Sequence, residues 1–254
     1  MKPVNARLAI VTATLGEDSP CVQSWSRLAA YEVPIYTVRD HMGVVPAFAE
    51  GVRFAFEEGA EAVMAIHDDV EILQPDWDLV VMEALSQGVK FAGFGGATSL
   101  GSADLYHKPY DPMQLARGGF VSNMRDAEAH GMRSRVPVQC VCFDGFCNIG
   151  TREWFKAAWE WLAHSGITHH LYDSLLGCLA ARAGVQPGLM LPVACHHHGG
   201  RTAVGNVMYQ AWAKEQDRDG DQGFWETAHR IGYNEFKDVL PMEVRNFVLP
   251  GLRR

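Results

Sequence analysis

Short apolar runs alternate with segments of helical spacing through the first hundred residues, and this alternation constrains the fold more than any other feature. Apolar runs at 7–13, 33–38 and 62–66 predict buried strands, and the segments 22–31 and 45–58 between them have the spacing of amphipathic helices. A β-α-β-α-β order indicates a parallel, doubly wound sheet with right-handed crossovers. We therefore expect an α/β fold with a Rossmann-like, mostly parallel central sheet flanked by helices. Ligands of such folds bind beyond the carboxyl ends of the strands.

The rest of the chain continues this pattern less regularly. Further elements are predicted as strands at 91–96, 136–143 and 185–195 and as helices at 77–87, 151–163 and 171–183. Residues 97–136 form a Gly-rich segment with aromatic and arginine side chains, and a loop of this length in a compact domain is usually functional. We expect residues 199–254 to form a lid loop and a helical C-terminal extension of the same domain as residues 1–198.

Composition narrows the classes of function. The 254 residues are 48% hydrophobic, which suits a domain with a substantial core. The net charge of −8 argues against a protein that binds nucleic acid mainly through its phosphates. Apolar stretches fall well short of the ~20 residues of a membrane span, and the N-terminal residues lack a signal-peptide core. We expect a soluble, cytoplasmic protein with no membrane span, whose six cysteines are reduced core residues.

Three groups of polar residues stand at predicted strand or helix ends. The first is His67-Asp68-Asp69, directly after the apolar run 62–66. Two adjacent acids repel one another unless something positive binds beside them, and oxygen ligands at a strand end suit Mg²⁺ or Mn²⁺ bridging a diphosphate. A solvated turn or a helix N-cap is the alternative interpretation of the same residues.

The other two groups lie later in the chain. The histidines at 196–198 follow an apolar strand, and imidazole is a good ligand for Mn²⁺, while a surface histidine cluster is the alternative. Asp173 lies in the first turn of the helix predicted at 171–183, where the helix dipole favours an acid. This residue is either a helix cap or, in a cleft, a general base that deprotonates a hydroxyl.

The order of these groups resembles that of the family 2-like glycosyltransferases of the GT-A fold, over residues 7–198. The segment IHDDVEI stands where that family has its DxD motif, LYDSLLGCLAARAGVQ resembles its acid-bearing helix, and LPVACHHH resembles the strand whose terminal histidine completes the metal site. The resemblance implies a GT-A fold and a Mn²⁺ or Mg²⁺ cofactor, with Asp69 as a metal ligand and His67 in place of the family's first acid. It favours His196 or His198 as the histidine ligand.

The resemblance also implies roles for other side chains. Asp173 becomes the catalytic base, and the segment FDGFCNIGTREWF places Asp144 and Gly145 on the acceptor side. The donor is expected to meet side chains at the carboxyl end of the sheet and an arginine of the lid. These donor-binding residues are Thr12, Thr14, Asp40, His67, Asp68 and Arg201.

We therefore expect a metal-dependent, inverting glycosyltransferase that moves a sugar from a nucleotide-diphosphate donor, with a UDP-sugar favoured, to an acceptor hydroxyl. The acceptor is left open among a glycan, a lipid-linked glycan, a small molecule and, less in keeping with the net charge, a modified DNA base. A nucleotidyltransferase is an alternative, but it normally has a Gly-rich basic loop where this chain has the acidic segment 14–18. A non-catalytic nucleotide-sugar-binding protein on the same fold is the other alternative.

Overall fold

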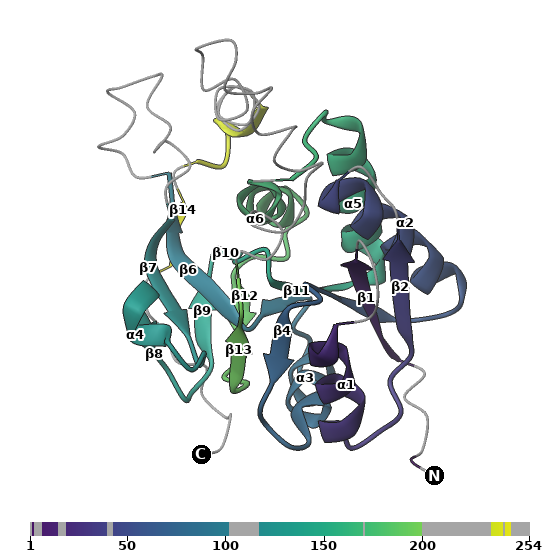
Figure 1. The fold of residues 1–254 in the computed structure, drawn as a ribbon. Helices are drawn as coiled ribbons and strands as arrows, with labels where there is room; N and C mark the ends of the chain where they lie inside the picture. The colour runs from purple at the N-terminus through teal and green to yellow at the C-terminus, as the bar shows by residue number, and fades with distance from the viewer. Residues whose placement is uncertain are drawn as a thin grey trace, which may run out of the picture.

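A seven-stranded mixed sheet forms the centre of the fold (Figure 1). The computed structural model describes residues 2, 7–14, 19–39, 43–101, 117–169, 171–199, 235–240 and 242–244, and the statements below concern this part of the chain. The strand order is β2-β1-β3-β11-β5-β12-β9. These strands are β1 Leu8–Thr14, β2 Ile35–Arg39, β3 Ala62–Ile66, β5 Phe91–Gly93, β9 Val138–Cys140, β11 Cys147–Thr151 and β12 Gly188–Met190.

Five of the seven strands run in the same direction. β1 pairs in parallel with β2 and β3, and β5 pairs in parallel with β12. β11 lies antiparallel between β3 and β5, and β9 lies antiparallel at the edge beside β12. The sheet is therefore mixed, with parallel pairing at β2-β1-β3 as the sequence predicts.

Two smaller sheets adjoin the central one. One has the order β10-β6-β7-β8, with β14 paired to β6, and the other is the two-stranded ribbon of β13 and β4. Their strands are β4 Val70–Ile72, β6 Gly95–Leu100, β7 Arg117–Ser122, β8 Met132–Arg133, β10 Cys142–Phe143, β13 Cys195–His197 and β14 Met242–Glu243. The β4–β13 ribbon lies beside the central sheet in Figure 1 and carries part of the candidate site.

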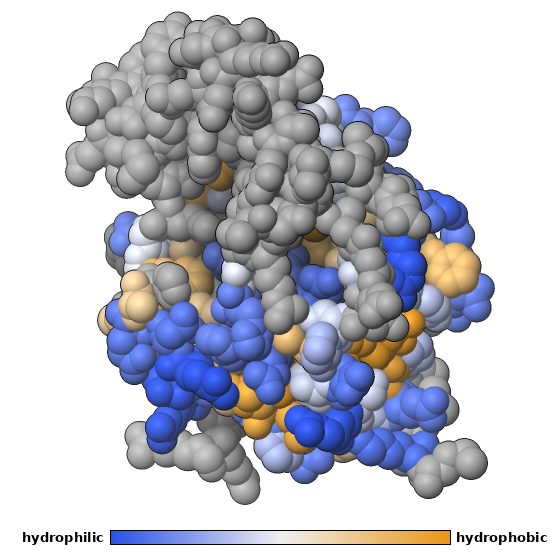
Figure 2. Space-filling view, in the orientation of Figure 1, coloured by the Kyte–Doolittle hydropathy of each residue, from blue (hydrophilic) through white to orange (hydrophobic). Residues whose placement is uncertain are grey.

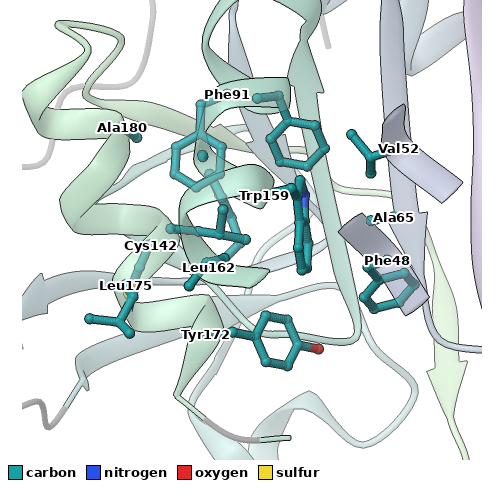
Figure 3. Packing of buried hydrophobic residues seen from close by; sticks show 14 of the residues in the cluster. Phe48, Val52, Ala65, Phe91, Cys142, Trp159, Leu162, Tyr172, Leu175 and Ala180 are labelled. Atoms are coloured by element: carbon teal, nitrogen blue, oxygen red, sulfur yellow. The ribbon is translucent and has the colours of Figure 1, made fainter. Parts of the chain in front are cut away.

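Helices cover both faces of the central sheet. They are α1 Pro20–Leu28, α2 Val44–Glu57, α3 Trp77–Ser86, α4 Ala127–His130, α5 Arg152–His164 and α6 Tyr172–Arg182. One core cluster joins the sheet to α2, α5 and α6 through residues such as Phe48, Trp159 and Tyr172 (Figure 3). A second cluster joins the sheet to α1 and α3 and includes Trp25 and Trp77. No helix in the described ranges has the length and apolar content that crossing a bilayer requires.

The described surface carries few large apolar side chains. In the face shown in Figure 2, hydrophilic residues surround smaller apolar areas. The exposed large apolar residues lie on separate elements and loops, which is ordinary for a folded domain. They are Tyr31, Phe54, Leu79, Met132 and Val136.

Among the elements predicted in the first hundred residues, β1, α1, β2, α2, β3 and α3 are confirmed to within a few residues, and β3 has the predicted bounds. The strand predicted at 91–96 is instead divided into β5 and β6, which belong to different sheets, and β4 was not predicted. The strand β11 was not predicted, because its sequence CNIGT has neither a long apolar run nor a period of two. Three other expectations were wrong in detail. The strand expected at 136–143 is divided into β9 and β10, and the strand expected at 185–195 is divided into β12 and β13. The described part of 97–136 contains the end of β6, β7, α4 and β8 instead of being irregular throughout.

Candidate functional site

The carboxyl end of β3 meets the β4–β13 ribbon. His67 follows β3 directly, and a turn in which the Val70 amide donates to the His67 carbonyl (3.2 Å) leads into β4. β13 pairs antiparallel with β4 and places His197 opposite Val70. The His198 amide donates to the Asp69 carbonyl oxygen (3.0 Å). The ribbon thereby brings the end of β13 beside the turn that follows β3, although 130 residues separate His67 and His197 in the chain.

His67, Asp69 and His197 form a group that could hold a metal ion. One side-chain ligand atom of each lies within 4.8 Å of the others. Mg²⁺ prefers oxygen ligands, whereas imidazole suits ions such as Fe²⁺ and Zn²⁺. The group of two imidazoles and one carboxylate could therefore hold a metal ion at the end of the sheet where the sequence predicts Mn²⁺ or Mg²⁺.

Asp69 is the most buried of the three ligands, with 7% of its surface exposed. Its Oδ1 lies 3.2 Å from Nε2 of His197, so the two side chains contact each other directly as a carboxylate–imidazole pair.

Within the metal group, Asp69 and His197 shift each other's pKa. Burial raises the pKa of Asp69, but the interactions with His197 and His67 outweigh burial and leave this pKa below its ordinary value. Burial lowers the pKa of His197, and its interactions with Asp69 and Asp144 outweigh burial and raise this pKa. The two shifts are in the directions expected when a carboxylate and an imidazole stabilise each other's charged forms. A bound cation would take the place of the proton on His197.

Tyr172 fixes the orientation of His67. The Tyr172 hydroxyl donates to the Gly145 carbonyl oxygen (3.0 Å), and Nε2 of His67 lies 2.7 Å from the same hydroxyl. Because a phenol has one proton, the hydroxyl accepts from Nε2–H, and Nδ1 is then the ring nitrogen with a lone pair for a metal. The His67 ring also stacks on Phe48, with 6.0 Å between centroids. A metal-binding histidine is typically held in this way by a hydrogen bond to its other nitrogen.

The histidine that completes the group is His197, whereas His196 and His198 were favoured from the sequence. Successive side chains of a strand point to opposite faces, so His197 faces the metal ligands while its neighbours face the other way. Ring centroids of His196 and His198 lie 4.3 Å apart, and His198 Nε2 lies 3.5 Å from Glu71 Oε2. The geometry therefore favours His197, not His196 or His198, as the ligand that acts together with Asp69.

The N-terminus of α6 adjoins the group through Tyr172 and its neighbour Asp173. Asp173 is 8% exposed, and its Oδ2 accepts from the Gly145 amide (3.1 Å) while its Oδ1 accepts from the Ser174 amide (2.8 Å). These contacts satisfy an amide in the first turn of α6 and tie the helix to the turn at 144–146. A Cβ on Gly145 would lie 2.5 Å from the Tyr172 hydroxyl, so this position requires glycine.

The strand β11 explains why the 144–146 turn lies here. Because β11 runs antiparallel to β3, its first residue, Cys147, pairs with Ile66, the last residue of β3. The Asp144 and Gly145 positions that precede β11 must then lie next to His67, whose amide donates to the Phe146 carbonyl (2.9 Å). The structure thus brings together the metal group, the predicted acceptor-side residues and Asp173.

The predicted donor-binding residues are less closely gathered. Thr12 is fully buried in the middle of β1, and its hydroxyl oxygen has no hydrogen-bond partner among the described residues. Thr14 is the last residue of β1 and is 8% exposed. Asp68 lies in the turn between two members of the metal group and is partly exposed. Asp40 and Arg201 fall outside the described residues.

The roles of His67 and His197 in the metal group were not predicted, although the sequence contains a signal for His197. Leu191, Val193 and Cys195 alternate with less apolar residues and are all buried. Continuing this period of two places His197 on the inward side and the neighbouring histidines on the outward side. His67 and Tyr172 are 105 residues apart in the chain, so no local sequence pattern predicts their contact.

Comparisons with known proteins give little further guidance. The chain matches no protein-family model and no curated protein. Among solved structures, it is similar to one titled "Crystal Structure of A197 from STIV", with a TM-score of 0.42 and 9% sequence identity over 75% of this chain and 81% of that one. This likeness is too distant to assign a function.

Proposed function

We propose that the chain is a metal-dependent glycosyltransferase of the GT-A type, which transfers a sugar from a nucleotide diphosphate to an acceptor hydroxyl with inversion. The observation that carries the proposal is the convergence of His67, Asp69 and His197 at the carboxyl end of β3. Doubly wound sheets bind nucleotides at this end of their strands. The mixed sheet, with its parallel strands β2-β1-β3 and helices on both faces, is compatible with that fold.

We propose Mn²⁺ as the cofactor, because two of the three ligands are imidazoles and Mg²⁺ is bound through oxygen ligands. When bound, the ion would supply Lewis-acid stabilisation of the departing diphosphate. His67, Asp69 and His197 would hold it from one side, which leaves positions for phosphate oxygens on the other. Tyr172 holds His67 in the tautomer in which Nδ1 carries the lone pair that would bind the ion.

We propose Asp173 as the base that takes the proton from the acceptor hydroxyl. The proposal is supported by the position of Asp173. This buried carboxylate lies beside Tyr172 and the 144–146 turn, next to the metal group. Each carboxylate oxygen accepts one backbone amide, which orients the carboxylate. The two backbone contacts would also hold the carboxylate in place during the reaction.

One observation favours a second candidate. Two histidines and one carboxylate are the donor set with which non-haem enzymes bind Fe²⁺, with open positions for oxygen and substrate. Such an enzyme would be active only with Fe²⁺ and would consume O₂. The glycosyltransferase proposal requires activity with Mn²⁺ under anaerobic conditions.

The test is an assay of nucleoside diphosphate release from a panel of UDP-, GDP- and TDP-sugars with Mn²⁺, without oxygen. We expect release with at least one donor, loss of release in Asp69→Asn, and normal release in Asp76→Asn, an exposed aspartate at the start of α3. Donor binding without turnover would indicate a binding protein, and release of sugar 1-phosphate, the leaving group when the nucleoside monophosphate is transferred, would indicate a nucleotidyltransferase. No effect of Mn²⁺ on any donor would refute the proposal.

A further inference from the structure

The turn at 144–146 joins the two parts of the candidate site. The Gly145 amide donates to Asp173 Oδ2 (3.1 Å), and the Gly145 carbonyl accepts from the Tyr172 hydroxyl (3.0 Å), which accepts from His67 Nε2–H (2.7 Å). The next carbonyl of the turn, that of Phe146, accepts from the His67 amide (2.9 Å). The position of this turn therefore determines where a metal ligand and a buried carboxylate lie.

Asn148 connects this turn to the central sheet. It lies on β11, where it pairs with Ala65 of β3 on one side and Gly93 of β5 on the other, and it is 1% exposed. Its Nδ2 donates to the Asp144 carbonyl (3.1 Å). Because a carbonyl oxygen can only accept, the amide nitrogen of Asn148 must be the atom that faces it. The side chain is thus fixed in one orientation, with its donor on the first residue of the turn.

Folding stability alone would favour an apolar residue at this position. Oδ1 of Asn148 is buried and has no hydrogen-bond partner among the described residues, which destabilises the folded state. Asparagine is also disfavoured in strands, whereas valine is favoured. The Asp144 carbonyl accepts a second hydrogen bond from the Cys147 amide (3.2 Å), so it would keep a partner without Asn148. The asparagine therefore requires an explanation other than stability.

We propose that Asn148 is a positioning residue, which holds the 144–146 turn where Gly145 can bond both Tyr172 and Asp173. Without the bond from Asn148, the turn could shift, and the Tyr172 hydroxyl would no longer meet His67 Nε2–H at its present distance. The effect on His67 rests only on the geometry of the metal group. The effect on Asp173 as a base rests on the proposed function.

Asn148→Val separates positioning from stability. We expect the free energy of unfolding, measured with urea in chelator, to equal or exceed that of the wild type, because valine suits a buried strand. The Mn²⁺ affinity measured by titration should fall at least about fivefold, somewhat less than the loss of about 10–100-fold that follows removal of a direct partner of a metal ligand. The control is Thr151→Val, which removes a buried hydroxyl at the far end of β11 and should leave the Mn²⁺ affinity unchanged.

Combining Asn148→Val with Tyr172→Phe tests the route through the tyrosine. In the Tyr172→Phe background, Asn148→Val should change the Mn²⁺ affinity by no more than about twofold, because the contact with His67 is already lost. An unchanged affinity in Asn148→Val, or an equal loss in both backgrounds, would overturn the proposal. A fall in affinity that comes with a fall in stability would show a structural role instead. If Asn148→Val does not fold, Asn148→Ala, which cannot overpack the core, takes its place.

A second readout requires neither metal nor glycosyl transfer. In NMR spectra of the metal-free protein with ¹⁵N-labelled histidine, the Nε2–H resonance of His67 is identified by its absence in His67→Gln. We expect this resonance in the wild type and in Thr151→Val, and we expect it to be shifted or lost in Asn148→Val. An unchanged resonance in Asn148→Val would overturn the proposal. A wild type that releases no nucleoside diphosphate would refute the proposed function, and the resonance would still decide the role of Asn148.

Discussion

Replacing Tyr172 with phenylalanine tests how the metal group is oriented. The substitution removes one hydroxyl, which accepts from His67 Nε2–H (2.7 Å) and donates to the Gly145 carbonyl (3.0 Å), and leaves the buried ring in place. His67 then loses the contact that selects its tautomer. Loss of a hydrogen bond to a metal-binding histidine typically weakens metal binding about 10–100-fold.

The effect can be measured as a loss of stabilisation by the metal. With Mn²⁺ at 100 times the wild-type Kd, binding stabilises the folded state by about 2.7 kcal/mol. The same concentration would stabilise Tyr172→Phe by about 1.4 kcal/mol for a tenfold weaker site and by about 0.4 kcal/mol for a hundredfold weaker one. The metal-free variant should also be less stable by about 1–3 kcal/mol, because the Gly145 carbonyl and His67 lose a buried partner.

Urea unfolding with Mn²⁺ and with a chelator separates these two losses. Tyr31→Phe removes the hydroxyl of an exposed tyrosine outside the site and is the matched control, in which both quantities should stay at their wild-type values. If Mn²⁺ stabilises Tyr172→Phe as much as the wild type, Tyr172 does not orient a metal ligand. The assignment of Nδ1 of His67 to the metal would then be wrong.

Three further predictions concern the base, the charge pair and the thiols. In Asp173→Asn, we expect kcat to fall about 10²–10⁴-fold, and we expect the Mn²⁺ affinity measured by titration to stay unchanged. An unchanged kcat would exclude Asp173 as the base. In the metal-free protein, His197 has a raised pKa, so its stabilisation is fully present below about pH 6.5 and is lost as the pH rises through the folded pKa. Urea unfolding of His197→Gln from pH 5 to 9 in chelator should lack this decline, and a decline equal to that of the wild type would contradict the pairing with Asp69. All six cysteines are buried thiols outside any disulfide, and burial raises the pKa of Cys140, Cys178 and Cys195 to about 12. An aromatic disulfide reagent should therefore label none of the six until the chain is unfolded. Rapid labelling of the native protein would show instead that a thiol is accessible.

The parts of the fold that follow from local pattern were predictable. The alternation of apolar runs and helical segments gives β1, α1, β2, α2 and β3 in order, and the parallel pairing of the strands follows from the helices that connect them. The place of Asp69 at the end of β3 follows from the same pattern. In each case the deciding residues lie within about fifteen positions of one another, so propensity and periodicity suffice.

The parts that depend on distant pairing were not predictable. β11 is formed by CNIGT because it lies between two buried strands, and Gly150 is needed there because a Cβ would lie 2.3 Å from the Phe155 ring. His67 was expected to bind the donor, and its place in the metal group depends on Tyr172 and on β13. Such contacts are set by tertiary packing, which a single sequence records only weakly.

The identity of the histidine in the metal group depends on the register between β13 and β4. A shift by one residue would turn His196 or His198 inward and His197 outward, since strand side chains alternate between faces. The register is held from α1, where Trp25 Nε1 donates to the Val70 carbonyl (2.8 Å) and the Ser24 hydroxyl accepts from the Ile72 amide (2.9 Å). These two contacts fix β4, and the pairing of His197 with Val70 then fixes β13. Helix α1, which contributes no ligand, therefore determines which imidazole meets Asp69.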